Sequence, residues 1–282
     1  MDKFLGFSYC ESSSGYLIFM GPDTLLLMNP FKRRQKEVST LDLDIKSDYK
    51  AYRALLAFVK GSDEFVIVFY SKSSVNVYQS QNYLWATYLE SNISSDFDFV
   101  DIAVFHNAIY VLTSDAKIGV LNLGWCSVSI NFLQLRNTPR VNCVSLRLVR
   151  DDDKLRVVNF TPKRILDVYE IDFSKMEYVK LNTLGDLALF YSPRTSCHAL
   201  SNPSMWGYYS NHVYSICTSR PKCEVYSWSN NLVDFYEHDH IHGLQVPYRS
   251  RLYWRDWCFR NLHEEVEHSL IYIPEWWTLC LP

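Results

Sequence analysis

Two β-rich runs, Tyr16–Met20 (YLIFM) and Thr24–Met28 (TLLLM), are joined by the turn GPD near the start of the chain. The same unit of run, turn and run recurs about 46 residues apart over its first four copies, a period typical of repeat architectures. The later copies are Phe65–Phe69 with Ser74–Tyr78, Ala108–Leu112 with Lys117–Leu121, Leu155–Asn159 with Ile165–Tyr169, and His212–Ile216 with Cys223–Ser227.

Each copy extends to four strands when alternation and enrichment in Val, Ile, Tyr and Phe are followed outward. The first copy gains Phe4–Tyr9 before its hairpin and Lys36–Thr40 after it. Four strands per repeat are the content of a propeller blade, which must stack on its neighbours to bury both faces. The competing fold is a β-sandwich, which carries about seven to nine strands, whereas this chain has about twenty.

The sequence therefore predicts an all-β fold: a β-propeller over residues 1–236, built of four-stranded antiparallel blades, with about five blades visible. The blades are expected near residues 4–40, 50–90, 97–135, 141–181 and 187–236.

Residues 237–282 break the repeat. His238–Leu281 offers no matching hairpin, and Arg260–Leu270 (RNLHEEVEHSL) reads as a short helix. An exposed Trp276–Trp277 pair would form a sticky patch, so both rings are expected to be buried. Terminal segments of repeat proteins usually cap the array, which predicts a C-terminal tail, 237–282, docked on the propeller.

Composition excludes several classes of partner. The net charge of −3 gives no global attraction to nucleic acid or to an acidic membrane surface. No apolar run approaches the length of a membrane span, and the first ten residues are too polar for a secretory signal. The eight cysteines are scattered without a CxxC pair, as in reduced thiols of an intracellular protein. The expected location is cytoplasmic or nuclear.

The block Leu184–Ser229 contains the runs LGD-x-ALF, Ser-Cys and Asn-His-Val-Tyr in order. With other short motifs along the chain, it resembles the KIB-type β-propeller domain of plant F-box proteins. The other matching motifs are Ser14–Leu17 (SGYL), Leu27–Phe31 (LMNPF), Tyr52–Leu56 (YRALL) and Ile273–Trp277 (IPEWW).

The resemblance implies a propeller that binds protein. Many members of that family carry an N-terminal F-box, which docks to the Skp1-type adaptor of a ubiquitin ligase, and the propeller then holds the substrate, for example a kinase. The first strand here is expected within about ten residues of Met1, and no helical F-box opening is seen. We therefore expect target binding without binding to a Skp1-type adaptor.

Few segments carry ligand or catalytic residue types. Glu237–His242 (EHDHIH) would place three histidines on one strand face, as in a zinc site, but an exposed polar linker is favoured. Asp151–Asp153 reads as a solvated turn, and Lys32–Arg34 as an exposed hairpin tip. Cys217 and Cys223 flank a turn, where packed, inert thiols are favoured over a reactive pair.

No G-x-S-x-G elbow, Walker loop, G-x-G-x-x-G fingerprint or H-E-x-x-H motif is present in the sequence. No metal, cofactor or catalytic residue is therefore predicted, and the chain is not expected to be an enzyme. The alternatives are a propeller-type hydrolase with acidic groups at a central channel, and a truncated, non-functional relative.

Aromatic residues provide the remaining signal. Trp206, Tyr208 and Tyr209 lie between two strand runs beside Ser, Asn and Gly, and they are the candidate protein-binding residues. Trp, Tyr and Arg are enriched at interface hot spots. Propeller blades also pack on large aromatic residues, so a structural role competes with the binding role at these positions.

Overall fold

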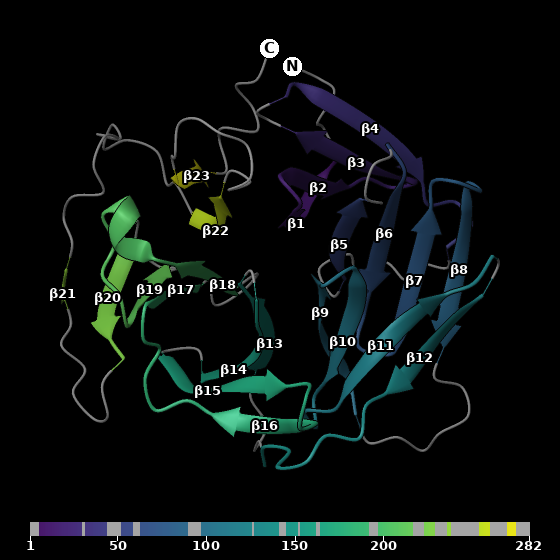
Figure 1. The fold of residues 1–282 in the computed structure, drawn as a ribbon. Coiled ribbons are helices and arrows are strands. Elements are labelled where there is room, and N and C mark those ends of the chain that lie inside the picture. Colours follow the sequence, from purple (N-terminus) through teal and green to yellow (C-terminus); the bar gives the residue numbers. More distant parts are fainter. Residues whose placement is uncertain are drawn as a thin grey trace. The chain divides into compact units, whose positions relative to one another are not determined.

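The computed structural model describes residues 6–29, 32–43, 52–58, 63–89, 97–125, 127–140, 145–151, 153–161, 164–191, 197–216, 223–228, 236–237, 254–259 and 270–274 (Figure 1). Among these residues no helix is long and apolar enough to cross a membrane. Contacts divide the chain into two units. The N-terminal unit is Phe4–Leu148 with Leu155–Val179, and the C-terminal unit is Met1–Lys3, Val149–Lys154 and Lys180–Pro282.

Four sheets have the simple order of a propeller blade, in which each strand pairs with the next along the chain. Blade 1 is β1 (Ser8–Ser13), β2 (Tyr16–Met20), β3 (Thr24–Asn29) and β4 (Arg34–Ser39). Blade 2 is β5 (Arg53–Phe58), β6 (Phe65–Tyr70), β7 (Ser74–Gln79) and β8 (Leu84–Leu89). Blade 3 is β9 (Phe99–Phe105), β10 (Ala108–Thr113), β11 (Ile118–Leu123) and β12 (Val128–Phe132). Blade 4 is β13 (Ser145–Arg150), β14 (Leu155–Thr161), β15 (Arg164–Asp172) and β16 (Glu177–Lys180).

Burial within a blade explains the repeated hairpin of the sequence. All five residues of β2 are buried, as are nearly all residues of β3, β6 and β7. Four of the six residues of the outer strand β4 are exposed. A strand covered on both faces reads as a continuous apolar run, whereas a strand covered on one face alternates. The two apolar runs of each repeat are therefore the middle strands of a blade.

Tight turns join these strands with few glycines. Ser13 pairs with Tyr16, and the two residues between them, Ser14 and Gly15, have φ angles of 51° and 74°. Two left-handed residues are the requirement of a two-residue type I′ hairpin turn. Asn107, at φ 64°, occupies the same kind of turn in blade 3. Asn enters the left-handed region more readily than most residues because its short polar side chain bonds locally.

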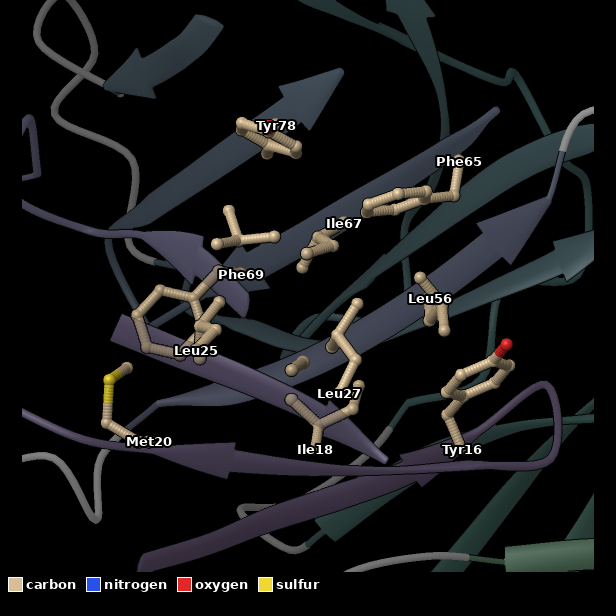
Figure 2. Close-up of a cluster of buried hydrophobic side chains, with 12 residues drawn as sticks. Tyr16, Ile18, Met20, Leu25, Leu27, Leu56, Phe65, Ile67, Phe69 and Tyr78 are labelled. Atoms are coloured by element: carbon tan, nitrogen blue, oxygen red, sulfur yellow. The ribbon is translucent and has the colours of Figure 1, made fainter. Parts of the chain in front are cut away.

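Blades stack face to face within the N-terminal unit. Ile18 and Leu27 of blade 1 and Leu56 and Ile67 of blade 2 are all fully buried in one cluster, which Figure 2 shows between the two sheets. Burying a side chain of this kind contributes about 1.5–3 kcal/mol, so the stacked face is a major source of stability.

The same stacking continues along the chain. Val68 and Val77 of blade 2 share a cluster with Val111 of blade 3, and Leu112 of blade 3 shares another with Val157 of blade 4. Each sheet of this unit thus covers its neighbour, which is the packing that the repeat predicted. The all-β propeller fold is confirmed.

Blade 5 corrects the expectation of a purely antiparallel sheet. It contains β17 (Leu187–Tyr191), β18 (Cys197–Ser201), β19 (His212–Ile216), β20 (Cys223–Ser227) and β21 (Tyr236–Glu237), in the order β18-β17-β19-β20-β21. β17 pairs with β19 in parallel. The chain turns back after β18 through the 3₁₀ helix η3 (Pro203–Trp206), and left-handed Asn202 and Gly207 flank that helix. This connection brings β19 alongside β17 in the same direction.

One further strand prediction was wrong. The first strand was predicted at Phe4–Tyr9, but β1 begins at Ser8 and includes the buried Glu11. In the tail, β22 (Trp254–Phe259) and β23 (Leu270–Pro274) form an antiparallel pair, and residues 260–269 of the expected helix lie outside the described residues. The docking of residues 237–282 stays a prediction, and Trp276 and Trp277 lie outside the described residues.

Candidate functional site

The structure places Trp206 and Tyr208 against the apolar core of blade 5. The Tyr208 ring lies edge-on to Phe190 and Tyr214, with centroid distances of 5.0 Å and 5.1 Å. Trp206 is half-buried and packs on the same cluster. These contacts give both rings a structural role, so any contribution to binding must come through the parts that stay exposed.

Tyr209 faces solvent, with 58% of its surface exposed. Its backbone N–H donates to the Tyr214 hydroxyl at 2.8 Å, which fixes the segment after η3. Met205, one turn earlier, is 80% exposed. The pair Met205 and Tyr209 is therefore the apolar surface of this segment, and binding by Trp206, Tyr208 and Tyr209 stays a prediction.

A second exposed aromatic surface lies in the N-terminal unit, on turns that the sequence analysis did not single out. Tyr83 ends the turn between β7 and β8, and Trp125 lies in the turn between β11 and β12. Tyr83 is 76% exposed and Trp125 is 70% exposed. Leu84 and Leu123, also exposed, flank them. We call these four residues the turn surface.

Hydrogen bonds hold the two turns together. The Gln79 side-chain amide donates to the Gly124 carbonyl at 2.8 Å, and the Asn82 side-chain amide donates to the Trp125 carbonyl at 2.7 Å. The Tyr83 N–H donates to the Gln79 carbonyl at 3.0 Å. The aromatic residues are thus presented from turns that are already ordered, which lowers the entropic cost of binding.

Tyr83 also breaks a local backbone rule. Its φ of 58° lies in the left-handed region, which costs a non-glycine residue about 1–2 kcal/mol. Gly or Asn would fit this position better, and the exposed ring gains little packing in return. A residue that breaks a local rule without a structural gain is a candidate functional residue.

The sequence signal for the turn surface is weak but present. Residues 79–84 (QSQNYL) and 122–128 (NLGWCSV) contain no charged residue, in a chain that is 21% charged. A large aromatic residue inside such a polar, uncharged turn is the feature that would have revealed it. Aromatic content alone does not, because most aromatic residues of the described ranges are buried in the core or pack against it.

A polar network joins the first strands of the four blades in the N-terminal unit, which are β1, β5, β9 and β13. Arg53 on β5 donates from Nε to Glu11 on β1 at 2.8 Å and from Nη1 to Asp101 on β9 at 3.1 Å. Tyr70 donates to the same Asp101 oxygen at 3.0 Å. The other Asp101 oxygen accepts the backbone N–H of Leu148 on β13 at 2.8 Å. This central polar network therefore links all four blades of the unit.

The charges of this network are matched to one another. Burial opposes the positive charge of Arg53, but Glu11, Tyr70 and Asp101 outweigh it and raise the pKa of Arg53. Burial raises the pKa of Tyr70 well above its ordinary value, so the phenol remains a neutral donor. Both carboxylates are already engaged by donors. The network thus fits a structural role better than the paired free carboxylates that a hydrolase needs.

The remaining candidates have ordinary surroundings where they are described. Asp151 Oδ1 accepts the backbone N–H of Lys154 at 2.8 Å, as in the solvated turn that was favoured. Lys32 and Arg33 form the exposed turn before β4. Glu237 ends β21, whereas residues 238–242 and Cys217 lie outside the described residues. In the described ranges, no group of three or more His, Cys, Asp or Glu comes together as a metal site.

Repeated four-stranded blades whose neighbours stack define the chain as a β-propeller protein. The chain matches the KIB1-4 beta-propeller family over residues 2–242, and it belongs to that family. This membership fits a protein-binding propeller. A search of curated proteins found no match.

Solved structures are only distantly similar to the chain. AztD from Citrobacter koseri, in its apo form, is 13% identical with a TM-score of 0.38, and the match covers 62% of this chain and 46% of AztD. This chain thus spans less than half of AztD. A luciferin-regenerating enzyme is 10% identical with a TM-score of 0.38, over 82% of this chain and 75% of the enzyme. The Cps50 (Swd1) β-propeller domain of Myceliophteria thermophila is 9% identical with a TM-score of 0.38, over 76% and 64%.

Proposed function

We propose that this chain is a non-enzymatic protein-binding propeller that holds a protein target in the way of the substrate-recognition half of a plant F-box protein. The observation that carries the proposal is the turn surface. Tyr83 and Trp125 are strongly exposed on two neighbouring blades whose turns are fixed by hydrogen bonds. Loops on a rigid scaffold are the usual place for recognition.

The chemistry of the turn surface suits a protein partner. Tyr and Trp bury large areas with few rotatable bonds, and they are over-represented among the residues that dominate interfaces. The turns carry amide and hydroxyl groups but no charge, so the contact does not require charge pairs to be desolvated. An uncharged, partly apolar segment of the target is the complement, and a kinase is the target class that the family resemblance suggests.

Met205 and Tyr209 offer a second surface of the same kind in the C-terminal unit. Their exposure favours a contact there, whereas the packed Tyr208 ring argues against including it. The two surfaces belong to different units of the chain and are best tested by separate variants. A Tyr208→Ala variant would report on the blade 5 core as much as on binding.

The test is a pull-down with the purified 282-residue chain, read by mass spectrometry and scored for kinases and for Skp1-type adaptors. We expect a target to be captured by the chain without the adaptor. Trp125→Ala combined with Tyr83→Ala should lower capture by at least tenfold, because two hot-spot truncations of about 1–2 kcal/mol each are involved.

Leu41→Ala is the matched control, since Leu41 is 72% exposed but lies outside both surfaces. It should leave capture unchanged. Capture that survives the turn-surface variant and falls with Met205→Ala plus Tyr209→Ala would move the site to the C-terminal unit. A target captured equally by all of these variants would refute both surfaces.

A further inference from the structure

The outermost strands of blades 1 and 4 have protected edges. An open strand edge presents unpaired N–H and C=O groups to other strands, and proteins usually guard such an edge with charged residues or cover it. β4 carries the charged residues Arg34, Lys36 and Glu37. β16 is covered instead, because the chain at Arg136 pairs with Glu177 in a parallel bridge. Both blades are thus guarded against the addition of a strand.

The outermost strand of blade 2 has neither kind of protection. β8 reads LWATYL and contains no charged residue and no proline. It ends its sheet, and β7 is the only strand of the described ranges that pairs with it. β12 (VSINF) is uncharged as well, but β8 begins directly after Tyr83. The edge of β8 therefore continues the turn surface without a break.

The hydrogen-bond pattern shows which backbone groups of β8 point outward. In an antiparallel sheet, successive residues of a strand bond alternately to the strand on one side and to the other side. The Ser71 N–H donates to the Ser74 carbonyl at 2.9 Å, so the even-numbered residues of β7 bond toward β6. The odd-numbered Val77 therefore bonds toward β8, where it pairs with Ala86. The residues of β8 on either side of Ala86 have backbone groups that point away from the sheet.

These outward-facing residues are Trp85 and Thr87. In the described part of the chain, their backbone groups make no hydrogen bond outside the sheet. Side chains hold the strand in place, because the Trp85 Nε1 donates to the Ser39 carbonyl at 2.8 Å and the Thr87 hydroxyl donates to Asn76 Oδ1 at 2.9 Å. The edge is thus both open and ordered, which lowers the entropic cost of binding.

We propose that an extended, uncharged segment of the partner protein adds to the outer edge of β8 as a further strand. Strand addition takes its affinity from main-chain hydrogen bonds and its specificity from alternate side chains. An uncharged segment is the complement, because neither β8 nor the turn before it carries a charge that could pair with a charged segment. Tyr83, at the start of the edge, holds one end of the segment. The inference rests on the proposed function and describes how the target is bound.

The experiment selects binders of the purified chain from a phage-displayed library of random short peptides, and fluorescence anisotropy measures the affinity of the selected peptides. We expect uncharged peptides in which apolar residues alternate. Thr87→Pro should weaken their binding about tenfold, because proline lacks the N–H that the added strand must bond. Thr87→Val is the matched control: it loses the same hydroxyl but keeps the N–H, and it should bind like the wild type.

The variant Tyr83→Ala plus Trp125→Ala separates this inference from the proposed function. Peptides that bind this variant weakly but bind Thr87→Pro normally would retain the turn surface and overturn strand addition. Peptides weakened by Thr87→Pro alone would support strand addition and remove the turn surface from the site. Peptides that respond to neither variant, or a selection that yields no peptide, overturn the inference.

A second copy of this chain is the alternative occupant of the edge. A dimer of the wild type that is lost in Thr87→Pro, measured by sedimentation equilibrium without peptide, would assign the edge to self-pairing and overturn the proposal. If Thr87→Pro does not fold, amide exchange of the wild type decides by NMR. The N–H groups of Trp85 and Thr87 should exchange more slowly when a selected peptide is bound, and unchanged exchange overturns the proposal.

Discussion

At the scale of single residues, Asp101 connects its own blade to two others through hydrogen bonds. It accepts hydrogen bonds from Arg53, Tyr70 and Leu148, which belong to blades 2 and 4. Asp101→Asn removes the negative charge and leaves Arg53 with Glu11 as its carboxylate partner. It also places an amide N–H, which cannot accept a hydrogen bond, opposite one of the three donors. Because breaking a buried ion pair is costly, we expect unfolding in urea to show a loss of about 3 kcal/mol.

Asp98→Asn is the comparison for that measurement. Asp98 pairs with Lys72 at 3.0 Å, but both side chains are well exposed, so this loss should stay below about 1 kcal/mol. Equal effects of the two substitutions would show that the central polar network adds no more than a surface ion pair.

Tyr83 allows stability and binding to be separated. Tyr83→Asn relieves the left-handed strain, because Asn adopts this conformation more readily, and removes a ring that is already exposed. We expect a gain of about 0.5–1 kcal/mol in unfolding free energy and, in the same protein, weaker target capture. A variant that is less stable than the wild type would show that the Tyr83 ring supports the fold.

Residue type alone predicted only part of the candidate site. Trp206, Tyr208 and Tyr209 are aromatic residues close together in the sequence, and the sequence favours none of them over the others as a binding residue. Their surroundings in the structure differ. Tyr208 packs on Phe190, whereas Tyr209 is exposed. Which side of a short 3₁₀ connection faces the core depends on tertiary packing, and no local pattern records it. The Arg53–Asp101 pair was likewise hidden, because its members lie one repeat apart.

At the scale of elements, the hairpin turn after β1 depends on Gly15. Its φ of 74° strains any residue with a Cβ, although there is room for one, since the nearest atom would be 3.8 Å away. Gly15→Ala should therefore cost about 1 kcal/mol through backbone strain alone. Gly15→Asn should cost clearly less in the same denaturation series. Equal costs would point to packing against Asn29 as the cause.

Strands were predicted correctly where apolar residues dominate. They were misplaced where the buried contacts are made by polar residues. The hairpins β2–β3 and β6–β7 have continuous apolar runs, and the structure places them as predicted. β1 reads SYCESS and was misplaced, because its buried Glu11 looks like a surface residue until Arg53 is known to face it. The parallel pairing in blade 5 requires a crossover, which periodicity does not reveal.

At the scale of the whole molecule, the stacking of blades shields middle strands from solvent more than outer strands. The middle strands β6 and β7 are covered on both faces, whereas the outer strand β4 is mostly exposed. Hydrogen exchange should therefore be slowest in β6 and β7 and faster in β4, since opening the middle strands requires separation of the blades. Uniform protection across each blade would mean that a blade opens as one piece.

The parallel pair in blade 5 has a consequence during synthesis. Ala188 of β17 pairs with His212 of β19. The strand that covers this edge of β17 is therefore synthesised 24 residues later, after β18 and η3. At the usual pace of about 5–20 residues per second, the ribosome leaves that edge of β17 open for roughly 1–5 seconds. An apolar strand with an open edge is a site for wrong pairing. The free edge of β17 is therefore expected to be open to wrong pairing until β19 (His212–Ile216) has emerged.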